Sequence, residues 1–426
     1  MNIHTTLPSK EGAIALDGAP LRILLTGYRS HKHVGGQGVY LRELARALRD
    51  LGHAVTVASG PPYPELDDGV ALVRLPSLNL FEESNAFAAF RPSFLRSWAD
   101  LSEWLSHNSG AFGEPYAFGR RLAHHVNANR DAYDVIHDNQ TLASAFTRLN
   151  KTIPVIATIH HPVAIDREFA LAATKTRFDR WLTKRWYAFT AMQANTARKL
   201  PRLLAVSDAA RNSHADLYAI KHEQVSVSFN GIDHDVFCPD VAIAREPGLI
   251  AATASADVPI KGVDILMEAF CALAPNRPDL RLELIGHLRD GPAKVKLDAS
   301  GLSSRVTCRS GVTREEIADL YRRASLVTCP ARFEGFGFPA AEAMACGTPV
   351  VASDGGALPE VVGDAGLIVP AGDAVAFATA IETLLDDPER ASALGEAAAL
   401  RARSAFDWTA HAQAAVALYR EALASC

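Results

Sequence analysis

The sequence lacks any long hydrophobic run. None of the apolar stretches in the 426-residue chain approaches the roughly 20 residues that a membrane-spanning helix needs. Residues 1–20 have neither a basic start nor a continuous apolar stretch, so they do not resemble a signal peptide. We therefore expect no transmembrane segment and a flexible tail over residues 1–20.

Cysteine and excess charge are also scarce. The six cysteines form no C-x-x-C pair, and several lie in strand-like apolar runs, where a thiol behaves as a small hydrophobe. This pattern favours a reducing, cytoplasmic location over a disulfide framework. The net charge of −5 gives no reason to expect a nucleic-acid partner. The 48% hydrophobic and 21% charged residues are typical of a soluble globular protein with room for two domains.

Short apolar runs alternate with amphipathic stretches along most of the chain. Residues 22–27 read as a buried first strand, and helically spaced apolar residues follow as far as Leu48. The second half repeats this rhythm from residue 248 onward. Such alternation predicts an α/β protein with parallel sheets and right-handed crossovers.

The stretch from residue 326 to 352 carries the strongest functional signal. It reads as a strand, a glycine loop, a short helix over 340–346 and another strand. The amides of residues 335–338 fall at the helix start, where unpaired N–H groups and the helix dipole favour a phosphate. Glu334 and Glu342 flank this loop, and acceptor-only carboxylates suit sugar or ribose hydroxyls. The arrangement predicts a sugar-nucleotide site, although the spacing alone also fits a capped surface turn.

The same stretch resembles the C-terminal signature of the retaining glycosyltransferases of family 4, which have the GT-B fold. The match consists of two glutamates with seven residues between them around a Gly-Phe-Gly loop: Glu334, Gly335, Phe336, Gly337 and Glu342. The resemblance covers most of the chain from about Leu21. It implies two Rossmann-like domains facing across a cleft, an acceptor-binding one over 21–240 and a nucleotide-sugar-binding one over 241–405. Residues 406–426 would form a helix that crosses back onto the N-terminal domain.

The implied activity is transfer of a hexose-type sugar from a nucleotide sugar to an acceptor hydroxyl. The donor is expected to be a UDP-, GDP- or ADP-sugar, and no cofactor is required. The acceptor is expected to be a glycan, a lipid-linked molecule or a small molecule. By the resemblance, Lys261 and the amides of Gly337 and Phe338 stabilise the leaving phosphate, Glu334 holds sugar hydroxyls and Glu342 holds the ribose. No side chain is an obvious covalent nucleophile, so we expect the acceptor to attack from the side that the leaving group vacates.

The N-terminal half contributes glycines and histidines to the predicted cleft. Gly35 and Gly36 could form a plain tight turn, but the resemblance places them beside the donor phosphates. His137, His160 and His161 lie at the carboxyl ends of predicted strands, where open α/β sheets bind ligands. The resemblance assigns His160 to the transferred sugar. His137 and His161 are acceptor-side candidates, with a structural role for His137 and a metal-ligand role for His161 as the alternatives.

No metal site is predicted. A third ligand near His161 is lacking. The segment Asp233-His234-Asp235 formally spells a D-x-D metal motif, but it falls in a stretch that resembles the family's inter-domain linker. GT-B enzymes do not rely on a metal bound in this way, so we discount the motif.

One family residue is missing. Residues 252–262 correspond to the family's Gly-Arg-x(5)-Lys-Gly, in which Lys261 and Gly262 match and Ser255 stands where arginine is expected. Both family cations neutralise the donor pyrophosphate, whose charge grows as the sugar leaves. We expect another cation to take over this role, with Arg332 and Arg289 as the candidates.

The segment 175–211 is strongly basic, with nine lysines and arginines against Asp179 and Asp208, and aromatic residues interleaved. It fits either an amphipathic helix on anionic lipid or a solvated charged face over a packed aromatic face. We favour the second interpretation. The first would give a weak peripheral contact at the inner membrane face.

Other functions are compatible with the same fold. A sugar-nucleotide epimerase or a phosphorylase would share it, because fold does not fix function. A nucleotide-sugar-binding protein with weakened catalysis is a third alternative, for which Ser255 is the only support.

Overall fold

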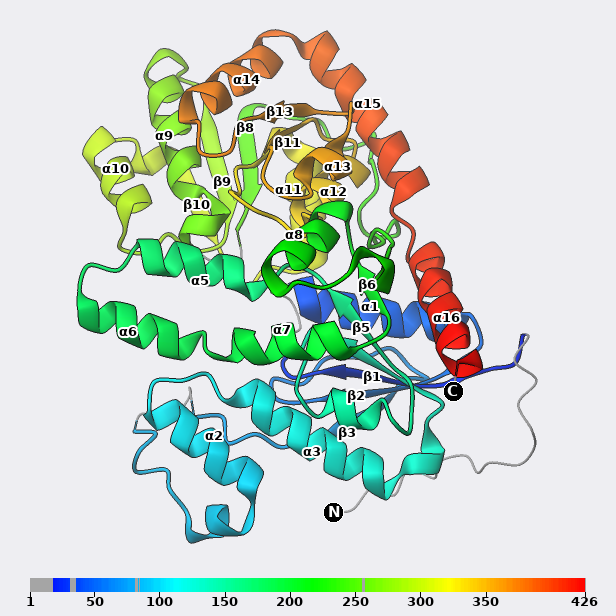
Figure 1. Cartoon of the computed structure of the whole chain (residues 1–426). Coiled ribbons are helices and arrows are strands. Elements are labelled where there is room, and N and C mark those ends of the chain that lie inside the picture. Colours follow the sequence, from blue (N-terminus) through cyan, green and yellow to red (C-terminus); the bar gives the residue numbers. More distant parts are fainter. Residues whose placement is uncertain (1–17, 31–35, 81–82, 84, 255–256, 426) are drawn as a thin grey trace.

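Two parallel β-sheets, each flanked by helices, organise the chain (Figure 1). The structure is a computed structural model and describes residues 18–30, 36–80, 83, 85–254 and 257–425. The α/β class and the pair of Rossmann-like sheets predicted from the sequence are confirmed.

The N-terminal sheet contains, among the described residues, seven strands in the order β3-β2-β1-β4-β5-β6-β7, all parallel. The strands are β1 (Arg22–Gly27), β2 (Ala54–Ser59), β3 (Ala71–Arg74), β4 (Val135–Asn139), β5 (Val155–Ile159), β6 (Leu203–Ala205) and β7 (Val225–Val227). Strands β4 and β5 are buried along their whole length. Burial on both faces explains why the central strands read as continuous apolar runs.

The C-terminal sheet repeats this plan with six parallel strands in the described chain, in the order β10-β9-β8-β11-β12-β13. The strands are β8 (Glu246–Thr253), β9 (Arg281–Ile285), β10 (Val306–Arg309), β11 (Ala324–Cys329), β12 (Val350–Ser353) and β13 (Leu367–Val369). From β8 the chain adds β9 and β10 on one side of the sheet, and then β11, β12 and β13 on the other side, so the strand order switches between β8 and β11. Ligands bind at such a switch point, outside the carboxyl ends of the strands.

Helices connect the strands and cover the sheets. They are α1 (Gly36–Asp50), α2 (Trp98–Asn108), α3 (Glu114–Ala128), α4 (Phe146–Leu149), α5 (Val163–Ala172), α6 (Arg177–Trp186), α7 (Phe189–Lys199), α8 (Asp208–Tyr218), α9 (Val263–Leu273), α10 (Pro292–Ser300), α11 (Arg314–Arg323), α12 (Phe338–Ala345), α13 (Leu358–Val362), α14 (Ala374–Asp386), α15 (Pro388–Ala405) and α16 (Trp408–Ala424). Helix α12 begins two residues before the predicted start, and Pro339 lies in its first turn, where no backbone N–H is needed.

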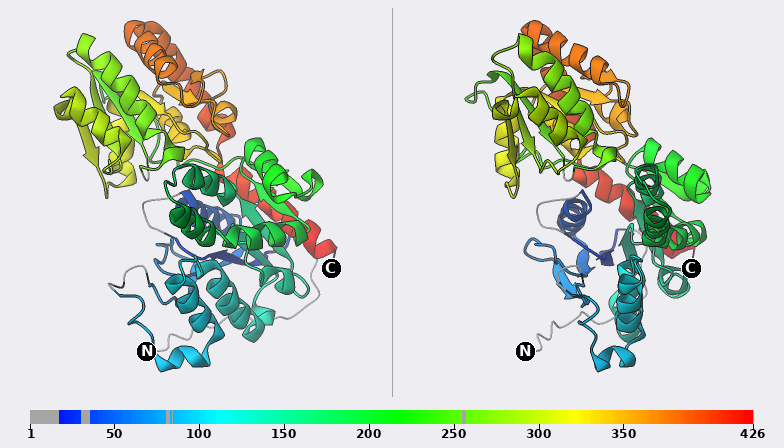
Figure 2. Two further views of the ribbon diagram at one scale, coloured as in Figure 1. Left: turned by 60° about the vertical axis from the view of Figure 1, so that its left-hand side comes forward. Right: turned by 90° about the vertical axis from the view of Figure 1, so that its left-hand side faces the viewer.

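The chain crosses between the two lobes twice, and the two crossings touch. The Ile232 amide donates to the Phe406 carbonyl oxygen at 3.1 Å. A Cβ on Gly231 would lie 2.2 Å from the Trp408 nitrogen, so this close approach requires glycine. After the second crossing, α16 packs on α1 and β5 of the N-terminal lobe, as the red helix in Figure 2 shows.

The basic segment is only partly packed. Phe189 is buried, and the Trp186 ring lies 5.3 Å from the Phe112 ring. Helix α6, by contrast, has no buried residue, and Phe178 and Trp181 are 65% and 54% exposed. The packed aromatic face that we favoured from the sequence is therefore wrong for the first half of α6.

Candidate active site

A lysine and a glutamate from two different loops meet at the carboxyl end of the C-terminal sheet. Lys261 Nζ donates to Glu334 Oε1 at 2.6 Å. Lys261 ends a short 3₁₀ helix, Pro259–Lys261, and Gly262 follows with φ +64°. Burial lowers the pKa of Lys261, but the charge and hydrogen bond of Glu334 outweigh it and hold the pKa above its usual value. The ammonium is therefore fully charged at neutral pH.

The glycine loop supplies unpaired amides beside this pair. Gly337 precedes α12 with φ +98°, and its carbonyl oxygen accepts from the Ala340 and Ala341 amides, which starts the helix. Within the described residues, no acceptor takes an amide of residues 335–338. Unpaired donors at a helix start form an anion site. Gly337, Lys261 and Glu334 line one shared pocket.

His160 approaches from the N-terminal lobe as a neutral ring. Asn139 Nδ2 donates to the Gln37 carbonyl oxygen at 2.9 Å, so Asn139 Oδ1 is the acceptor of its 2.7 Å bond with His160 Nε2. His160 therefore carries its proton on Nε2 and a lone pair on Nδ1. Burial, with neighbouring histidines, lowers the pKa of His160 to about 3. Such a ring accepts a hydrogen bond at neutral pH but does not act as an acid.

The two lobes touch at the glycine loop. A Cβ on Gly335 would lie 2.1 Å from the His160 carbonyl oxygen. Ser207 Oγ, from the start of α8, donates to the Gly335 carbonyl oxygen at 2.6 Å. The pocket that Lys261 and Gly337 share holds only about 10 Å³, roughly the room for one water. The residues that line this pocket all belong to the C-terminal lobe, so it is a local hollow of that lobe, while the contacts of Gly335 show where the two lobes touch.

A second contact joins the lobes at the start of α8. The Glu360 carboxylate, from α13, accepts the amides of Asp208 at 2.8 Å and Ala209 at 2.6 Å. A carboxylate at a helix N-terminus pairs with otherwise orphaned amides and the helix dipole. We did not predict Ser207 or Glu360 from the sequence. The Ser207-Asp208 pair is recognisable in the sequence as a helix cap. Its partners Gly335 and Glu360 lie in the other lobe, and no sequence pattern near Ser207 predicts contact with them.

Glu342 lies partly buried on α12. Burial raises its pKa to about 8, with Arg314 opposing this shift and Glu43 adding to it. Arg314 Nη1 lies 2.6 Å from Glu43 Oε1 and 3.2 Å from Asp233 Oδ2. These ion pairs join α11 to α1 and to the linker. They also give Asp233 of the formal D-x-D segment a partner other than a metal, and no cluster of three or more metal-ligating side chains occurs in the described chain.

The structure places His137 in a buried hydrogen-bond chain under α16, and the side chain is 1% exposed. His411 Nδ1 donates to the Phe229 carbonyl oxygen, so the neutral His411 ring can only accept on Nε2, and this fixes the donor of every other hydrogen bond in the series. The donors run in one direction, from Tyr419 to His137 Nδ1, from His137 Nε2 to Thr158, from Thr158 to Tyr40 and from Tyr40 to His411 Nε2. Both ring nitrogens of His137 are occupied. These contacts favour the structural alternative for His137 over the acceptor-side role.

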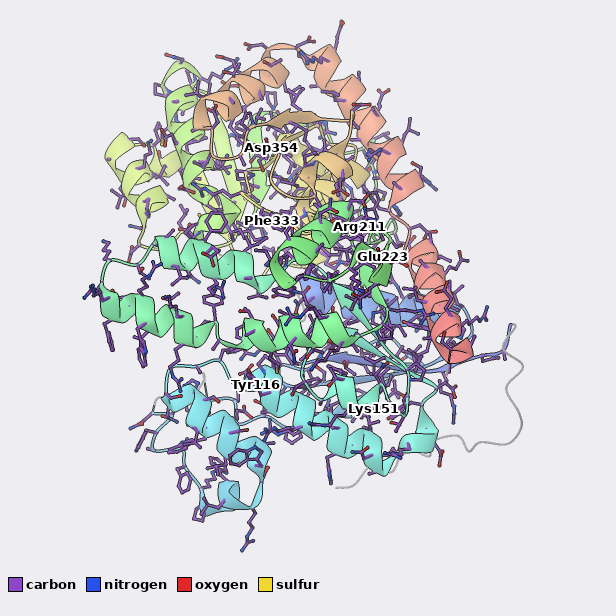
Figure 3. All side chains as sticks on the ribbon, in the orientation of Figure 1. Tyr116, Lys151, Arg211, Glu223, Phe333 and Asp354 are labelled. Carbon is purple, nitrogen blue, oxygen red and sulfur yellow. The ribbon has the colours of Figure 1, made fainter. Side chains whose placement is uncertain are left out.

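His161 lies at the lobe boundary. His161 Nε2 pairs with Asp166 Oδ2 at 2.7 Å, and its ring lies 6.2 Å from that of Phe333 in the other lobe, which is labelled in Figure 3. The side chain is one-third exposed. This position remains compatible with the predicted acceptor side, and Asp166 is a neighbour that we did not predict.

The two candidate cations differ. Arg332 donates to both carboxylate oxygens of Asp264, at 2.9 and 2.7 Å, and this pairing raises its pKa. A guanidinium held in this way does not favour the donor-binding role expected for Arg332. Arg289 is exposed, and its guanidinium forms no ion pair within the described residues. Ser255 and Gly35 lie outside the described residues.

Two aromatic residues of the glycine loop lie at the lobe junction. Phe336 is 3% exposed, and its ring packs 6.1 Å from Phe229 and 5.5 Å from Phe406. Phe338 lies 3.3 Å from the position that a Cβ on Gly36 would occupy. The burial of the Phe336 ring is compatible with the donor contact expected for this residue, which depends on its backbone amide.

Comparison with known proteins identifies the chain's relatives. Residues 34–236 match the family described as Glycosyltransferase Family 4, and residues 247–387 match Glycosyl transferases group 1. An MMP alpha-(1->4)-mannosyltransferase of Mycolicibacterium hassiacum is 42% identical over 95% of this chain and 99% of that protein. The chain belongs to glycosyltransferase family 4. A D-inositol 3-phosphate glycosyltransferase of Kribbella flavida is 30% identical, with 91% of each chain covered.

Solved structures support the same conclusion for the fold of this family 4 glycosyltransferase. The sucrose-phosphate synthase of Thermosynechococcus elongatus superimposes with a TM-score of 0.72 at 22% identity, over 95% of this chain and 99% of that one. WaaG, a glycosyltransferase of lipopolysaccharide biosynthesis, gives 0.69 at 17% identity, over 93% and 99%. Anabaena HepE in complex with UDP and glucose gives 0.67 at 17% identity, over 95% and 100%. The expected GT-B fold is confirmed. Among the described helices, none has the length and apolar character to cross a bilayer.

Proposed function

We propose that this glycosyltransferase moves a hexose from a nucleotide sugar to an acceptor hydroxyl and retains the anomeric configuration. The observation that carries the proposal is the grouping of the Lys261 ammonium with the amides of residues 335–338, which have no acceptor in the described part of the chain. A charged donor and several fixed N–H groups suit a diphosphate whose negative charge grows as the sugar departs. Glu334, at 2.6 Å from Lys261, is placed to hold the hydroxyls of the departing sugar.

The acceptor would approach from the N-terminal lobe. His160 carries a lone pair on Nδ1 and accepts a hydrogen bond from a sugar hydroxyl, while its low pKa excludes it as an acid. The leaving phosphate then takes the proton of the attacking hydroxyl. No side-chain base is needed, because the leaving phosphate and the attacking hydroxyl lie on the same face of the transferred sugar. Lobe closure through Gly335 excludes water, which limits hydrolysis of the donor.

Arg289 is the proposed second cation. Its guanidinium is not engaged by a carboxylate in the described chain, whereas Arg332 is held by Asp264. Its backbone amide donates to Asp257 at 3.0 Å, which places the residue beside the loop that carries the family's arginine position. Glu342 is proposed for the ribose, because a carboxylic acid with a pKa of about 8 both donates and accepts hydrogen bonds at neutral pH.

Mannose is the sugar to test first, and a glycan the acceptor. The relative at 42% identity is named for α-(1→4)-mannosyl transfer. The Anabaena neighbour was solved in complex with UDP-glucose, so UDP-glucose belongs in the same screen as GDP-mannose. ADP-glucose completes the set of expected nucleotides. Retention means that an α-linked donor gives an α-linked product.

The test is a transfer assay with these three donors and a series of manno-oligosaccharide acceptors, with Glu334→Ala as control. Proton NMR of the product should show an α-linkage formed only by the wild type. An inverted linkage would disprove retention. Conversion of the donor to its epimer without acceptor would indicate an epimerase, and phosphate-dependent release of a sugar phosphate would indicate a phosphorylase. Binding without turnover would indicate a nucleotide-sugar-binding protein.

A further inference from the structure

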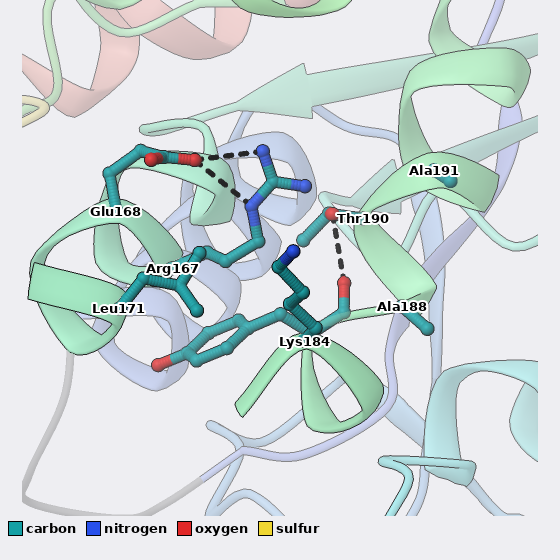
Figure 4. Close-up of a pocket in the computed structure, with 8 residues that line it drawn as sticks. Arg167, Glu168, Leu171, Lys184, Ala188, Thr190 and Ala191 are labelled. Carbon is teal, nitrogen blue, oxygen red and sulfur yellow. Dashed lines mark hydrogen bonds and ion pairs between the residues drawn. The ribbon is translucent and has the colours of Figure 1, made fainter. Parts of the chain in front are cut away.

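Helices α5, α6 and α7 line an open cavity of about 400 Å³ on the surface of the N-terminal lobe (Figure 4). This volume lies in the range of small-molecule sites, whereas the closed pocket at Lys261 holds about 10 Å³. The cavity walls carry a guanidinium, a carboxylate, an ammonium, a phenol ring and a hydroxyl. These groups belong to Arg167, Glu168, Lys184, Tyr187 and Thr190.

The cavity lies close to the inter-lobe cleft. Helix α5 starts directly after His160 and His161 and packs against the 3₁₀ helix that ends at Lys261. Asp166 of α5 pairs with His161, and its charge also acts on both Lys261 and Tyr187. Arg167, the next residue, already lines the cavity. Helix α5 therefore contributes both to the cavity, through Arg167, and to the surroundings of Lys261, through Asp166.

The polar groups of the cavity suit a sugar ring. Arg167 Nη2 and Nε lie 2.9 and 3.2 Å from Glu168 Oε1, so this pair presents donors and acceptors side by side. Figure 4 shows the Arg167 and Lys184 side chains turned into the same space, next to the Thr190 hydroxyl. No ion pair of Lys184 occurs in the described chain. Tyr187 and Leu171 add apolar surface, which suits the C–H face of a pyranose while the charged groups bind its hydroxyls.

We propose that this cavity is a secondary subsite for one sugar unit of an oligosaccharide acceptor, away from the unit that receives the transferred sugar. The assignment to the acceptor depends on the proposed function, while the ligand class depends on the cavity alone. A subsite of this kind makes affinity depend on acceptor length, because short acceptors do not reach it.

The experiment compares wild type with Lys184→Ala and Arg167→Ala. Lys199→Ala and Arg177→Ala are matched controls, because these exposed cations of α7 and α6 do not line the cavity. Saturation-transfer NMR measures the Kd for methyl mannoside and for manno-oligosaccharides of two to six units. A kinetic assay measures the acceptor KM over the same series. Melting temperatures verify that each variant is folded.

We expect the cavity variants to raise Kd and KM at least about tenfold for the longer oligosaccharides and less than about twofold for methyl mannoside. Equal weakening at all lengths, or values unchanged from wild type, overturns the subsite even if transfer proceeds normally. If the wild type transfers no sugar but binds long oligosaccharides, and Lys184→Ala weakens that binding, the proposed function is refuted while the cavity is still a sugar-binding site. Loss of binding to phosphatidylglycerol vesicles, with sugar binding unchanged, overturns the proposal in favour of a lipid headgroup.

Discussion

Replacing Gly335 by alanine tests whether the closed arrangement of the lobes is the reactive one. The new Cβ would lie 2.1 Å from the His160 carbonyl oxygen, and such contacts essentially never fall below 3.0 Å. The loop and His160 must therefore move apart by about 0.9 Å, the difference between these two distances. A misplacement of about 1 Å in an active site lowers the rate about 100-fold. We expect Gly335→Ala to lower kcat by about this factor.

The same substitution should leave each lobe intact. Gly335 does not have a positive φ, so alanine at this position introduces no backbone strain within the C-terminal lobe. Its near contacts belong to His160 and His161, which lie in the other lobe. We therefore expect binding of the nucleoside diphosphate, measured by calorimetry, to change less than about threefold, and the melting temperature to fall only slightly.

Gly291→Ala is the matched control. Gly291 has an extended backbone, and its nearest contact to a new Cβ is 3.9 Å, to the Arg289 carbonyl oxygen. This variant should retain nearly full kcat. If Gly335→Ala also retained kcat within about twofold of wild type, closure through this contact would not be part of the reaction. Small-angle scattering with and without donor would then show whether the lobes close in another way.

The remaining predictions concern charge and surface. Lys261→Ala should lower kcat/KM by about 10²–10³, or about 2.7–4 kcal/mol, because it removes preorganised charge from the leaving diphosphate, and Lys261→Arg should lose less. Arg289→Ala should slow transfer more than Arg332→Ala, and unchanged rates in both variants would end the idea of a replacement cation. Burial lowers the pKa of His137 to about 3 in the folded chain, against about 6.5 in the unfolded chain. Between these two pH values only the unfolded chain binds a proton at His137, so the contribution of His137 to the free energy of unfolding is lost as pH falls below 6.5. The destabilisation caused by His137→Gln in urea unfolding should thus shrink by about 1.4 kcal/mol per pH unit between pH 6.5 and 4.5, and a pH-independent difference contradicts this. If exposed Phe178 and Trp181 dock on anionic lipid, a Phe178→Ser/Trp181→Ser variant will lose co-sedimentation with phosphatidylglycerol vesicles, whereas equal partitioning of variant and wild type rules the contact out.

Hydrogen bonds between the lobes also bear on how the two lobes separate. Ser207 and Glu360 hold the lobes together through hydrogen bonds at 2.6–2.8 Å to the glycine loop and to the start of α8. Any separation of the lobes breaks these hydrogen bonds. This makes lobe opening a candidate for the slow step of the reaction.

The sequence by itself determined the local elements and the chemistry of the glycine loop. The apolar runs predicted the strands because both faces of a parallel sheet are buried. Gly337 and Pro339 indicated the start of α12, because glycine adopts a positive φ without strain and proline fixes φ at a helical value and lacks the N–H. The family resemblance implied that Lys261 and Glu334 belong to one site, but their hydrogen bond was not predicted.

Only the tertiary structure decided which of these residues face a partner and which are buried. Ser207 reaches Gly335 across 128 positions of sequence, and His137 meets Tyr419 across 282. Arg332 is engaged by Asp264, and α6 has no buried residue, for the same reason: side-chain environment depends on how separate helices and lobes pack. Periodicity and spacing report short-range backbone preferences, and contacts of this range are not encoded in them.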